Sequence, residues 1–225
     1  MKLYIIIPVY NEEKTLSEVI RRVKLLKINK EILVVDDGST DRSQEIIRRT
    51  SGIKKFMHKK NCGKGAAVKT ALKHSKGDIF LVQDADLELD PFQIPRIIAP
   101  IRKKEAKVVY GSRNKYARDN KRDLLFYFKV HLLITFFTNL LFGTHLTDEP
   151  CGYKAFDSKL IKSISIDHDR FEWEPEVTAK IAKMGIRIEE VPVKANSRSI
   201  KEGKKLRRRD GVKALLTLIK YKFVS

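Results

Sequence analysis

Short apolar runs alternate with helical stretches through the first half of the chain, and this alternation most constrains the fold. Most of the runs are nearly continuous in apolar residues, which is typical of strands buried on both faces of a parallel sheet. The helical stretches between them cover residues 12–26, 41–50, 65–74 and 91–104, and the runs read LYIIIPV, EILVVDD, KKFMHKK, DIFLVQD and AKVVYGSR. Strands joined by helices predict an α/β fold with a mostly parallel sheet flanked by helices.

Polar residues follow the carboxyl end of each of these runs. In chain order the clusters read PVYNEE, DDGSTD, NCGKGAA, DADLE and GSR. The carboxyl ends of parallel strands lie at one edge of a sheet, and ligands bind in the crevice beyond that edge. We therefore expect the clusters to meet there.

The fourth cluster is a group of acids in a basic chain. Asp84, Asp86 and Glu88 alternate along a segment that we expect to be extended, so their side chains can point the same way. Crowded carboxylates repel one another unless a cation lies between them, and oxygen ligands favour Mg²⁺ or Mn²⁺. The prediction is a divalent cation bound to a diphosphate; the alternative is a solvated acidic loop. Asp90, directly before Pro91, is the expected cap of the next helix.

Two further clusters carry groups suited to a nucleotide. Asp36 or Asp37 can accept hydrogen bonds from a base or ribose, or the motif DDGSTD can simply build a turn and cap the next helix. Lys64 stands between glycines before a helix and can approach a phosphate. Its motif, NCGKGAA, lacks the ending and spacing of a Walker A sequence.

The composition describes one globular domain with a strong positive charge. Of the 225 residues 42% are hydrophobic, and 47 Lys and Arg against 28 Asp and Glu give a formal net charge of +19. This excess favours polyanionic partners. Nucleic acid is disfavoured, because no aromatic residues interleave with the basic run KKLRRR and the acidic cluster would repel a phosphate backbone. Cys62 and Cys151 lack metal-ligand spacing, and we expect both to be reduced.

Two helical segments of the second half are amphipathic. The stretch 124–142 is apolar apart from one polar stripe, formed by His131, Thr135, Thr138 and Asn139. The stretch 212–225 places leucines and Phe223 opposite another stripe, formed by Lys213, Thr217 and Lys220. Both helices can lie on a bilayer, where basic residues gain about 1 kcal/mol each near anionic lipid. Packing on the domain, or pairing in a homodimer, is the alternative.

Taken in order, eight motifs resemble those of glycosyltransferase family two, in its dolichyl-phosphate mannose and glucose synthase-like branch. They are IIIPVYNEEKTL, ILVVDDGSTD, NCGKGAAV, DADLELDP, VVYGSR, LTDEPCGYKAF, RFEWEPEVTAKIAKMG and RIEEVPV, and they span nearly the whole chain. The resemblance implies a GT-A type, Rossmann-like fold that binds a nucleotide-sugar donor, with Mg²⁺ or Mn²⁺ at the leaving diphosphate. Many members of the branch have glutamine where Glu88 stands.

The resemblance also assigns residues by matching position. It implies a donor site formed by Pro8, Tyr10, Glu12, Asp36, Asp37, Lys64, Asp84, Ala85 and Asp86. It implies a metal site formed by Asp84, Asp86 and Glu88. For the phosphate of an acceptor the matching pair is Ser112 and Arg113, and further candidates are Arg122, Arg198, Lys204 and Lys205.

Members of this branch transfer a hexose from a UDP- or GDP-sugar to a polyprenyl phosphate, with inversion at the anomeric carbon. Such an acceptor is already an anion and needs little help from a base. If the acceptor is instead a sugar hydroxyl, soluble or carried on a protein or glycan, a general base is required. Asp148 and Glu174 are the candidates for that base, and the expected catalytic residues are Asp86, Arg113 and Asp148.

The resemblance suggests how the single domain is organised. Residues 1–113 form a nucleotide-sugar-binding half, residues 114–211 an acceptor-side half, and residues 212–225 an amphipathic C-terminal helix. Members of the branch often carry transmembrane helices after this domain, and the sequence has none there. We expect a cytoplasmic protein that lies peripherally on the cytoplasmic face of the membrane.

Overall fold

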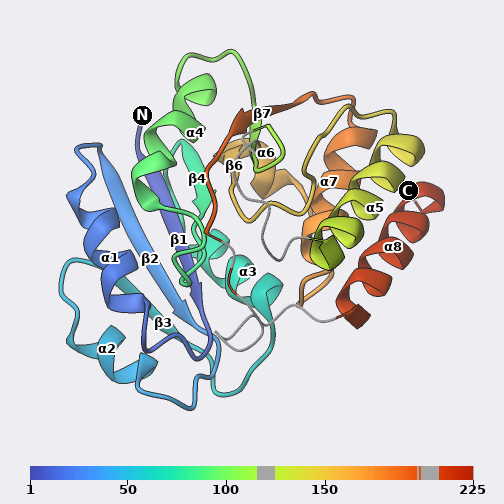
Figure 1. Cartoon of the computed structure of the whole chain (residues 1–225). Helices are drawn as coiled ribbons and strands as arrows, with labels where there is room; N and C mark the ends of the chain where they lie inside the picture. Colours follow the sequence, from blue (N-terminus) through green and yellow to red (C-terminus); the bar gives the residue numbers. More distant parts are fainter. Residues whose placement is uncertain (116–124, 197, 199–207, 225) are drawn as a thin grey trace.

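One seven-stranded sheet organises the protein (Figure 1). The computed structural model describes residues 1–115, 125–196, 198 and 208–224. The strands are β1 (Leu3–Val9), β2 (Lys30–Asp36), β3 (Lys54–Met57), β4 (Ile79–Val82), β5 (Val108–Ser112), β6 (Lys154–Asp157) and β7 (Ile188–Pro192), in the order β3-β2-β1-β4-β6-β5-β7. All neighbouring strands are parallel except at β6, which runs antiparallel to β4 and β5. The predicted α/β fold with a mostly parallel sheet is confirmed.

Helices cover both faces of the sheet. They are α1 (Leu16–Leu25), α2 (Ser43–Arg49), α3 (Lys64–His74), α4 (Ile94–Arg102), α5 (Leu125–Phe142), α6 (Ser158–Ser163), α7 (Trp173–Lys183) and α8 (Arg208–Phe223), with a 3₁₀ turn η1 (Pro91–Gln93) before α4. Asp90 caps that turn as expected, because its Oδ1 accepts a hydrogen bond from the Phe92 amide at 3.1 Å.

The core has two parts because side chains of β1 alternate between the faces. Ile5 and Ile7 pack with α1 and α4 on one face, and Tyr4 and Ile6 pack with α3, α6 and α7 on the other. β1 is therefore buried on both faces, which explains its continuous apolar sequence. This central position fixes the carboxyl end of β1 in the middle of the sheet edge.

The sequence did not predict β6 and α6. β6 has only four residues, and it begins with Lys154, which is fully buried. A strand of four residues with a charged residue at each end shows neither an apolar run nor a clear alternation. Its antiparallel insertion brings the preceding segment, residues 147–152, to the ligand-binding edge of the sheet.

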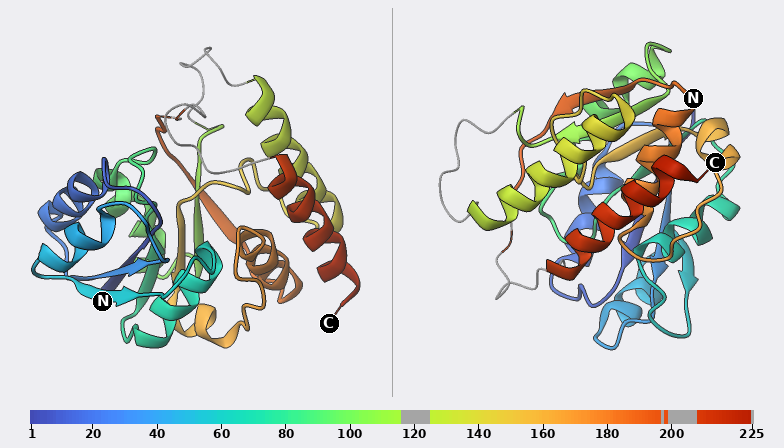
Figure 2. Two further views of the ribbon diagram at one scale, coloured as in Figure 1. Left: turned by 90° about the horizontal axis from the view of Figure 1, so that it is seen from below. Right: turned by 90° about the vertical axis from the view of Figure 1, so that its right-hand side faces the viewer.

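Helices α5 and α8 lie side by side and pack outside α7, as two views show (Figures 1 and 2). Ile134 of α5 packs with Ala214 and Leu218 of α8 and with Ala179 of α7. No helix in the described ranges has both the length and the apolar character needed to cross a bilayer.

Candidate functional site

A cavity of about 700 Å³ lies beyond the carboxyl ends of the strands. All five polar clusters contribute to its walls, as predicted. From these clusters it is lined by Pro8, Tyr10, Glu12, Asp37, Asn61, Gly63, Lys64, Asp84, Ala85, Asp86, Glu88 and Arg113. The second half of the chain supplies α5, the segment before β6, the start of α7 and the start of α8. Asp36 and Ser112 are buried but do not line the cavity.

The acidic cluster lies on a tight turn, so the expectation of an extended segment was wrong. Leu87 has a positive φ of 61°, and Asp86 Oδ1 accepts a hydrogen bond from the Glu88 amide at 3.0 Å. The buried Gln83 amide donates to the carbonyl oxygens of Asp84 and Leu89 and ties the two ends of the turn together. The carboxylates therefore point to different partners.

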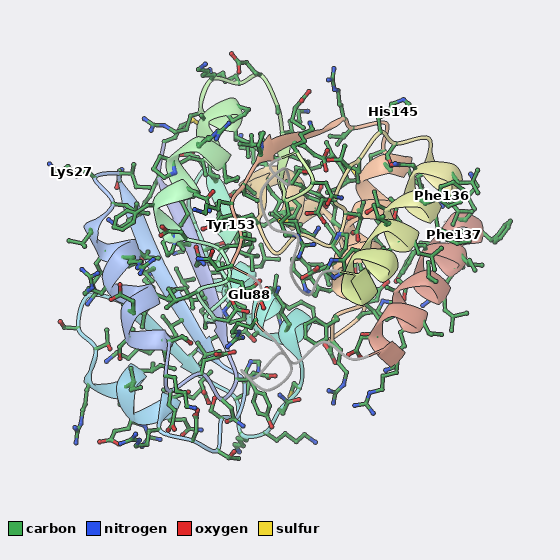
Figure 3. All side chains as sticks on the ribbon, in the orientation of Figure 1. Lys27, Glu88, Phe136, Phe137, His145 and Tyr153 are labelled. Carbon is green, nitrogen blue, oxygen red and sulfur yellow. The ribbon has the colours of Figure 1, made fainter. Side chains whose placement is uncertain are left out.

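Tyr153, from the second half of the chain, contacts the residues on either side of this turn. Its hydroxyl lies 2.7 Å from Gln83 Oε1 and 2.8 Å from the Asp90 carbonyl oxygen. Figure 3 shows Tyr153 and Glu88 near the centre of the molecule, where the two halves of the chain meet. Asp84 also lies directly against Gly152, and a Cβ atom there would collide with its carboxylate.

Two cationic side chains, Lys64 and Arg198, form ion pairs with the acids of the cluster. Lys64 Nζ lies 2.7 Å from Asp84 and 2.9 Å from Glu174. Burial alone would lower the pKa of Lys64, but the charges of Asp84 and Glu174 raise it above its usual value. The lysine therefore remains charged and joins the acidic turn to the start of α7.

Arg198 contacts the other acids of the cluster. Its guanidinium lies 3.0 Å from Glu12, 3.0 Å from Asp86 and 3.8 Å from Glu88. Burial, followed by the charges of Asp84 and Glu88, raises the pKa of Asp86 to about 6 despite the arginine. The site thus gathers more negative charge than these two cations compensate.

This donor set suits a hard divalent cation, because it offers carboxylate oxygens alone. The carboxylates of Asp84, Asp86 and Glu88 do not converge as a group within 4.8 Å of one another. A bound cation would therefore need side-chain rotation away from Lys64 and Arg198. The excess of negative charge around Asp86 favours such an exchange.

Asp37 organises the loop before α3. Its Oδ1 accepts from the Cys62 amide at 3.0 Å and lies 2.7 Å from His58 Nδ1. Its Oδ2 accepts from the Asn61 side chain at 3.0 Å and the Gly63 amide at 2.7 Å. Asp37, His58 and Cys62 form the one group of three potential metal ligands within 4.8 Å in the described residues, but hydrogen bonds already saturate the Asp37 carboxylate.

Asp36 builds the turn after β2. Its Oδ2 accepts hydrogen bonds from the amides of Gly38 and Ser39, both at 3.1 Å. Gly38 has a φ of 72° and lies so close to the Lys60 backbone that a Cβ atom would not fit. Asp36 and Asp37 of DDGSTD therefore both hold backbone amides, which was one of the two alternatives for this motif.

Arg113 and Asp148 form a bidentate ion pair at the other end of the cavity. Asp148 accepts from Arg113 Nε and Nη2, both at 2.7 Å, and from the Arg113 amide at 2.8 Å. Burial would raise the pKa of Asp148, but the Arg113 guanidinium lowers it below its usual value. Arg113 lines the cavity and Asp148 does not. A buried carboxyl with a lowered pKa in this position suits the orientation of Arg113 better than proton acceptance.

The remaining predicted phosphate ligands are distributed unevenly. The Ser112 hydroxyl bonds to Thr147 at 2.6 Å, behind the cavity wall. Arg198 faces the acidic cluster at the donor end. Arg122, Lys204 and Lys205 lie outside the described residues.

Sequence reasoning missed a buried network behind the cavity. Glu149 lines the cavity and accepts a hydrogen bond from Thr178 at 2.8 Å. Lys154 donates to the Glu149 carbonyl oxygen, and its Nζ lies 3.8 Å from the centre of the Tyr110 ring. Glu149 and Lys154 both belong to the motif TDEPCGYKAF, but their partners Thr178 and Tyr110 lie on separate elements, so no pattern in the sequence indicated the network.

Comparison with known proteins places this site in a family. Residues 4–165 match the family model described as Glycosyl transferase family 2. The chain belongs to glycosyl transferase family 2. The family predicted from the ordered motifs is therefore confirmed.

Relatives of this family 2 protein include bacterial and archaeal chains. It is 31% identical over 209 residues to the undecaprenyl-phosphate 4-deoxy-4-formamido-L-arabinose transferase of Edwardsiella ictaluri, covering 89% of this chain and 62% of that protein. It is 30% identical over 198 residues to an uncharacterised protein of Methanocaldococcus jannaschii, covering 86% and 81%. The chain thus spans less than two thirds of the length of the transferase that it matches.

A solved structure supports the fold of this family 2 chain. Glucosyl-3-phosphoglycerate synthase from Mycobacterium tuberculosis, determined with Mn²⁺, uridine diphosphate and phosphoglyceric acid, superimposes with a TM-score of 0.76. The match covers 100% of this chain and 79% of that chain at 20% sequence identity. At this identity the likeness concerns the fold alone, and it confirms the expected GT-A type architecture.

Proposed function

We propose that this family 2 protein transfers a hexose from a nucleoside-diphosphate sugar to a polyprenyl phosphate, with inversion at the anomeric carbon. One observation carries the proposal: a single cavity joins an acidic end, at Asp84 and Asp86, to a cationic end at Arg113. A metal-bound diphosphate suits the first end, and a phosphate acceptor suits the second. The name of the Edwardsiella relative, an undecaprenyl-phosphate transferase, supports the acceptor class.

The donor end would hold the nucleotide and its cation. Asp84, Asp86 and Glu88 would bind Mg²⁺ or Mn²⁺, which neutralises charge on the leaving diphosphate when bound. Lys64 would release a carboxylate and hold the diphosphate. The nucleoside would lie against the remaining donor-side residues of the cavity, which are Pro8, Tyr10, Glu12, Asp37 and Ala85.

The acceptor end would act without a protein base. An oxygen of the acceptor phosphate forms the new bond to the anomeric carbon while the bond to the diphosphate breaks, and the diphosphate leaves with the electron pair. Arg113 would hold the acceptor phosphate, and Asp148 would fix the orientation of its guanidinium. Glu174 is a poor candidate for a base, because it forms an ion pair with Lys64.

A donor-by-acceptor assay tests this proposal. UDP- and GDP-hexoses are offered with short polyprenyl phosphates or with free sugars, in Mn²⁺, in Mg²⁺ or in chelator. We expect transfer to a lipid phosphate only with a divalent ion, and a loss of at least about 100-fold in Asp86→Asn. Glu105→Gln, a change at an exposed side chain, is the matched control. Transfer to free sugars alone would refute the acceptor, and metal-independent transfer would refute the metal site.

We also propose that the protein contacts a membrane through the outer apolar face of α5 and α8. We define this face by its exposed side chains, Leu132, Leu133, Phe136, Leu140, Val212, Leu216, Ile219 and Phe223. Figure 3 shows Phe136 at the outer side of the molecule. The predicted polar stripe of α5 turns inward instead: Thr135 accepts from the Glu149 amide, and Asn139 bonds to Leu146. A surface helix with this polarity suits an apolar medium outside.

Charge and position favour lipid over a second copy of the chain. Exposed lysines accompany the outer apolar face at Lys213, Lys220 and Lys222, and two copies would each bring a net charge of +19. Ile134 of α5 and Ala214 of α8 line the cavity, so the two helices that carry this face also form part of the cavity wall. With both cysteines reduced, a peripheral position on the cytoplasmic membrane face follows as part of the proposal.

Vesicle flotation distinguishes a membrane from a second copy of the chain as the partner of the outer apolar face. We expect binding to anionic vesicles that weakens with salt, and a loss of at least about tenfold in a Phe136→Ser, Leu216→Ser double variant. Lys103→Ser, at an exposed position away from the face, is the control. A concentration-dependent dimer that the double variant dissociates, with no vesicle binding, would replace the membrane by a second copy.

A further inference from the structure

A buried carboxylate oxygen in the cavity wall lacks a partner. Glu149 lines the cavity and has an exposed fraction of only 1%. Its Oε1 accepts a hydrogen bond from the Thr178 hydroxyl at 2.8 Å. Its Oε2 is buried and bonds to none of the described residues. Buried carboxylate oxygens are normally hydrogen-bonded, so this one suggests a donor that comes from a ligand.

The buried lysine nearby does not take this role. Lys154 Nζ lies 3.8 Å from Glu149 Oε1, beyond hydrogen-bond distance, and donates to the backbone carbonyl of Glu149 instead. Burial, as the largest cause, raises the pKa of Glu149, Lys154 lowers it, and Glu174 raises it again. Thr178 is thus the one hydrogen-bond partner of this carboxyl group among the described residues, and burial disfavours the ionised form, which a hydrogen bond donated to Oε2 would stabilise.

The place of Glu149 in the site limits the chemistry of the ligand. Oγ1 of Thr178, its partner, also lies 2.9 Å from the carbonyl oxygen of Glu174, whose carboxylate belongs to the donor end with Lys64. Asp148, its neighbour in sequence, belongs to the ion pair with Arg113 at the acceptor end. Glu149 therefore lies between the two ends proposed for phosphates. A phosphate beside Glu149 would bring only acceptors and more negative charge, whereas a hydroxyl group is a neutral donor.

We infer that Glu149 is a specificity-determining residue, which accepts a hydrogen bond at Oε2 from one hydroxyl group of the transferred sugar. This inference rests on the proposed function, because it assigns the space between the two phosphate ends to the hexose. Glu149 would therefore favour nucleotide sugars that keep a free hydroxyl at one ring position. A deoxy or acylated sugar would leave the Glu149 carboxylate without this hydrogen bond.

A series of monodeoxy donors tests the inference. The probes are the nucleoside-diphosphate hexose that the wild-type protein transfers best and its analogues that lack one hydroxyl each. We expect the wild type to lose at least about tenfold in kcat/KM with one of these analogues. In Glu149→Gln the same analogue should lower kcat/KM by less than about threefold. The amide NH₂ that takes the place of Oε2 does not accept a hydrogen bond from the sugar.

A second variant and a binding measurement keep the test decisive. Glu149→Asp retains the charge but withdraws the oxygens by one methylene, and it should lose the same discrimination. Glu105→Gln should discriminate as the wild type does. If a variant folds but is inactive, calorimetric affinities for the intact and deoxy donors give the comparison, and the affinity for the nucleoside diphosphate alone should stay within about twofold of the wild-type value.

The outcomes separate this inference from the proposed function. A wild-type protein that transfers no hexose refutes the proposed function. A wild type that transfers hexose, with Glu149 variants that discriminate among the analogues as it does, overturns the role of Glu149 alone.

Discussion

The ion pair of Arg113 and Asp148 illustrates how single residues set the properties of this site. Both side chains are largely buried, and two hydrogen bonds of 2.7 Å join them. Removing one member of a buried pair leaves the other charge uncompensated, which costs more than the pair contributes when intact. The guanidinium that faces the cavity thus depends on a carboxylate that lies outside it.

Asp148→Asn should lower the free energy of unfolding by about 3–5 kcal/mol at pH 7. The folded pKa of Asp148 lies below its ordinary value of 3.8, so its ionised form stabilises the fold above about pH 4, and this contribution disappears as pH falls through the folded pKa. Urea denaturation at several pH values checks this, and the difference between wild type and variant should shrink below pH 3.8. A constant difference down to the lowest pH would contradict the ionic origin. If Asp148 were instead a base that titrates near neutrality, the difference would already change between pH 5 and 8.

The two cysteines should differ sharply in reactivity. Cys151 is fully buried, and burial raises the pKa of its thiol to about 12, with Asp148 adding to the rise. Cys62 is half-buried, on the loop that Asp37 holds. At pH 8 we expect a thiol reagent to modify one cysteine quickly in the native protein and the second only on unfolding. Cys62→Ser should abolish the fast phase, and a fast phase that survives this change would place the reactive thiol elsewhere.

Residue types were predicted better than residue partners. The sequence placed Pro8, Tyr10, Glu12, Lys64 and Arg113 in one site, and all of them line the cavity. It did not show that the Asp37 carboxylate would bond to the loop before α3, or that Lys64 would form an ion pair with Glu174. Such pairings depend on contacts between positions far apart in sequence, and the residue pattern of a single chain does not reveal these contacts.

At the scale of elements, α5 shows how a helix can serve the site with its polar side. Asn139 donates to the Leu146 carbonyl oxygen at 2.8 Å and accepts from the Leu146 amide at 2.9 Å. Its Oδ1 also accepts from the Thr144 hydroxyl at 2.7 Å. The helix therefore fixes the loop that leads to Asp148.

Asn139→Ala should reduce the free energy of unfolding by about 1–3 kcal/mol, because it leaves backbone groups of Leu146 without partners. Leu140→Gln, one position further along the same helix, should change it by less than about 0.5 kcal/mol, because Leu140 is 64% exposed. Chemical denaturation of both variants tests which side of α5 faces the rest of the protein. Equal losses would show that the apolar side also packs against protein in solution.

Periodicity predicted this helix well and failed at the shortest elements. The stretch 124–142 matches α5 (Leu125–Phe142), because many residues with a regular polar stripe define a helix clearly. In α8 the pattern did not show which side would be buried: Thr217, predicted on one polar stripe with Lys213 and Lys220, is buried, whereas both lysines are exposed. The four residues of β6 are set by their neighbours in the sheet, and the turn at Leu87 is set by hydrogen bonds of Gln83 and Asp86.

On the scale of the whole molecule, the fold was predictable because it repeats one local signal. The mostly buried strands β1, β2 and β4, each followed by a helix, are readable one by one, whereas the edge strand β3 is largely exposed. The parallel arrangement then fixes the common edge. The inserted antiparallel strand does not disturb that edge, since β6 pairs with β4 and β5 along its length. The cavity therefore draws its walls from both halves of the chain, and a ligand within it contacts elements distant in sequence.

Ligand binding should consequently stabilise the molecule as a unit. With Mn²⁺ and a nucleoside diphosphate together at about 100 times the dissociation constant, the free energy of unfolding should rise by about 2.7 kcal/mol. Either one alone should have a smaller effect, because the carboxylates of Asp84 and Asp86 and the diphosphate complete one another's coordination of the cation. Thermal or urea unfolding with each combination measures this, with Glu105→Gln as control. In Asp86→Asn the joint increment should largely vanish, whereas a full increment in that variant would place the cation away from the acidic turn.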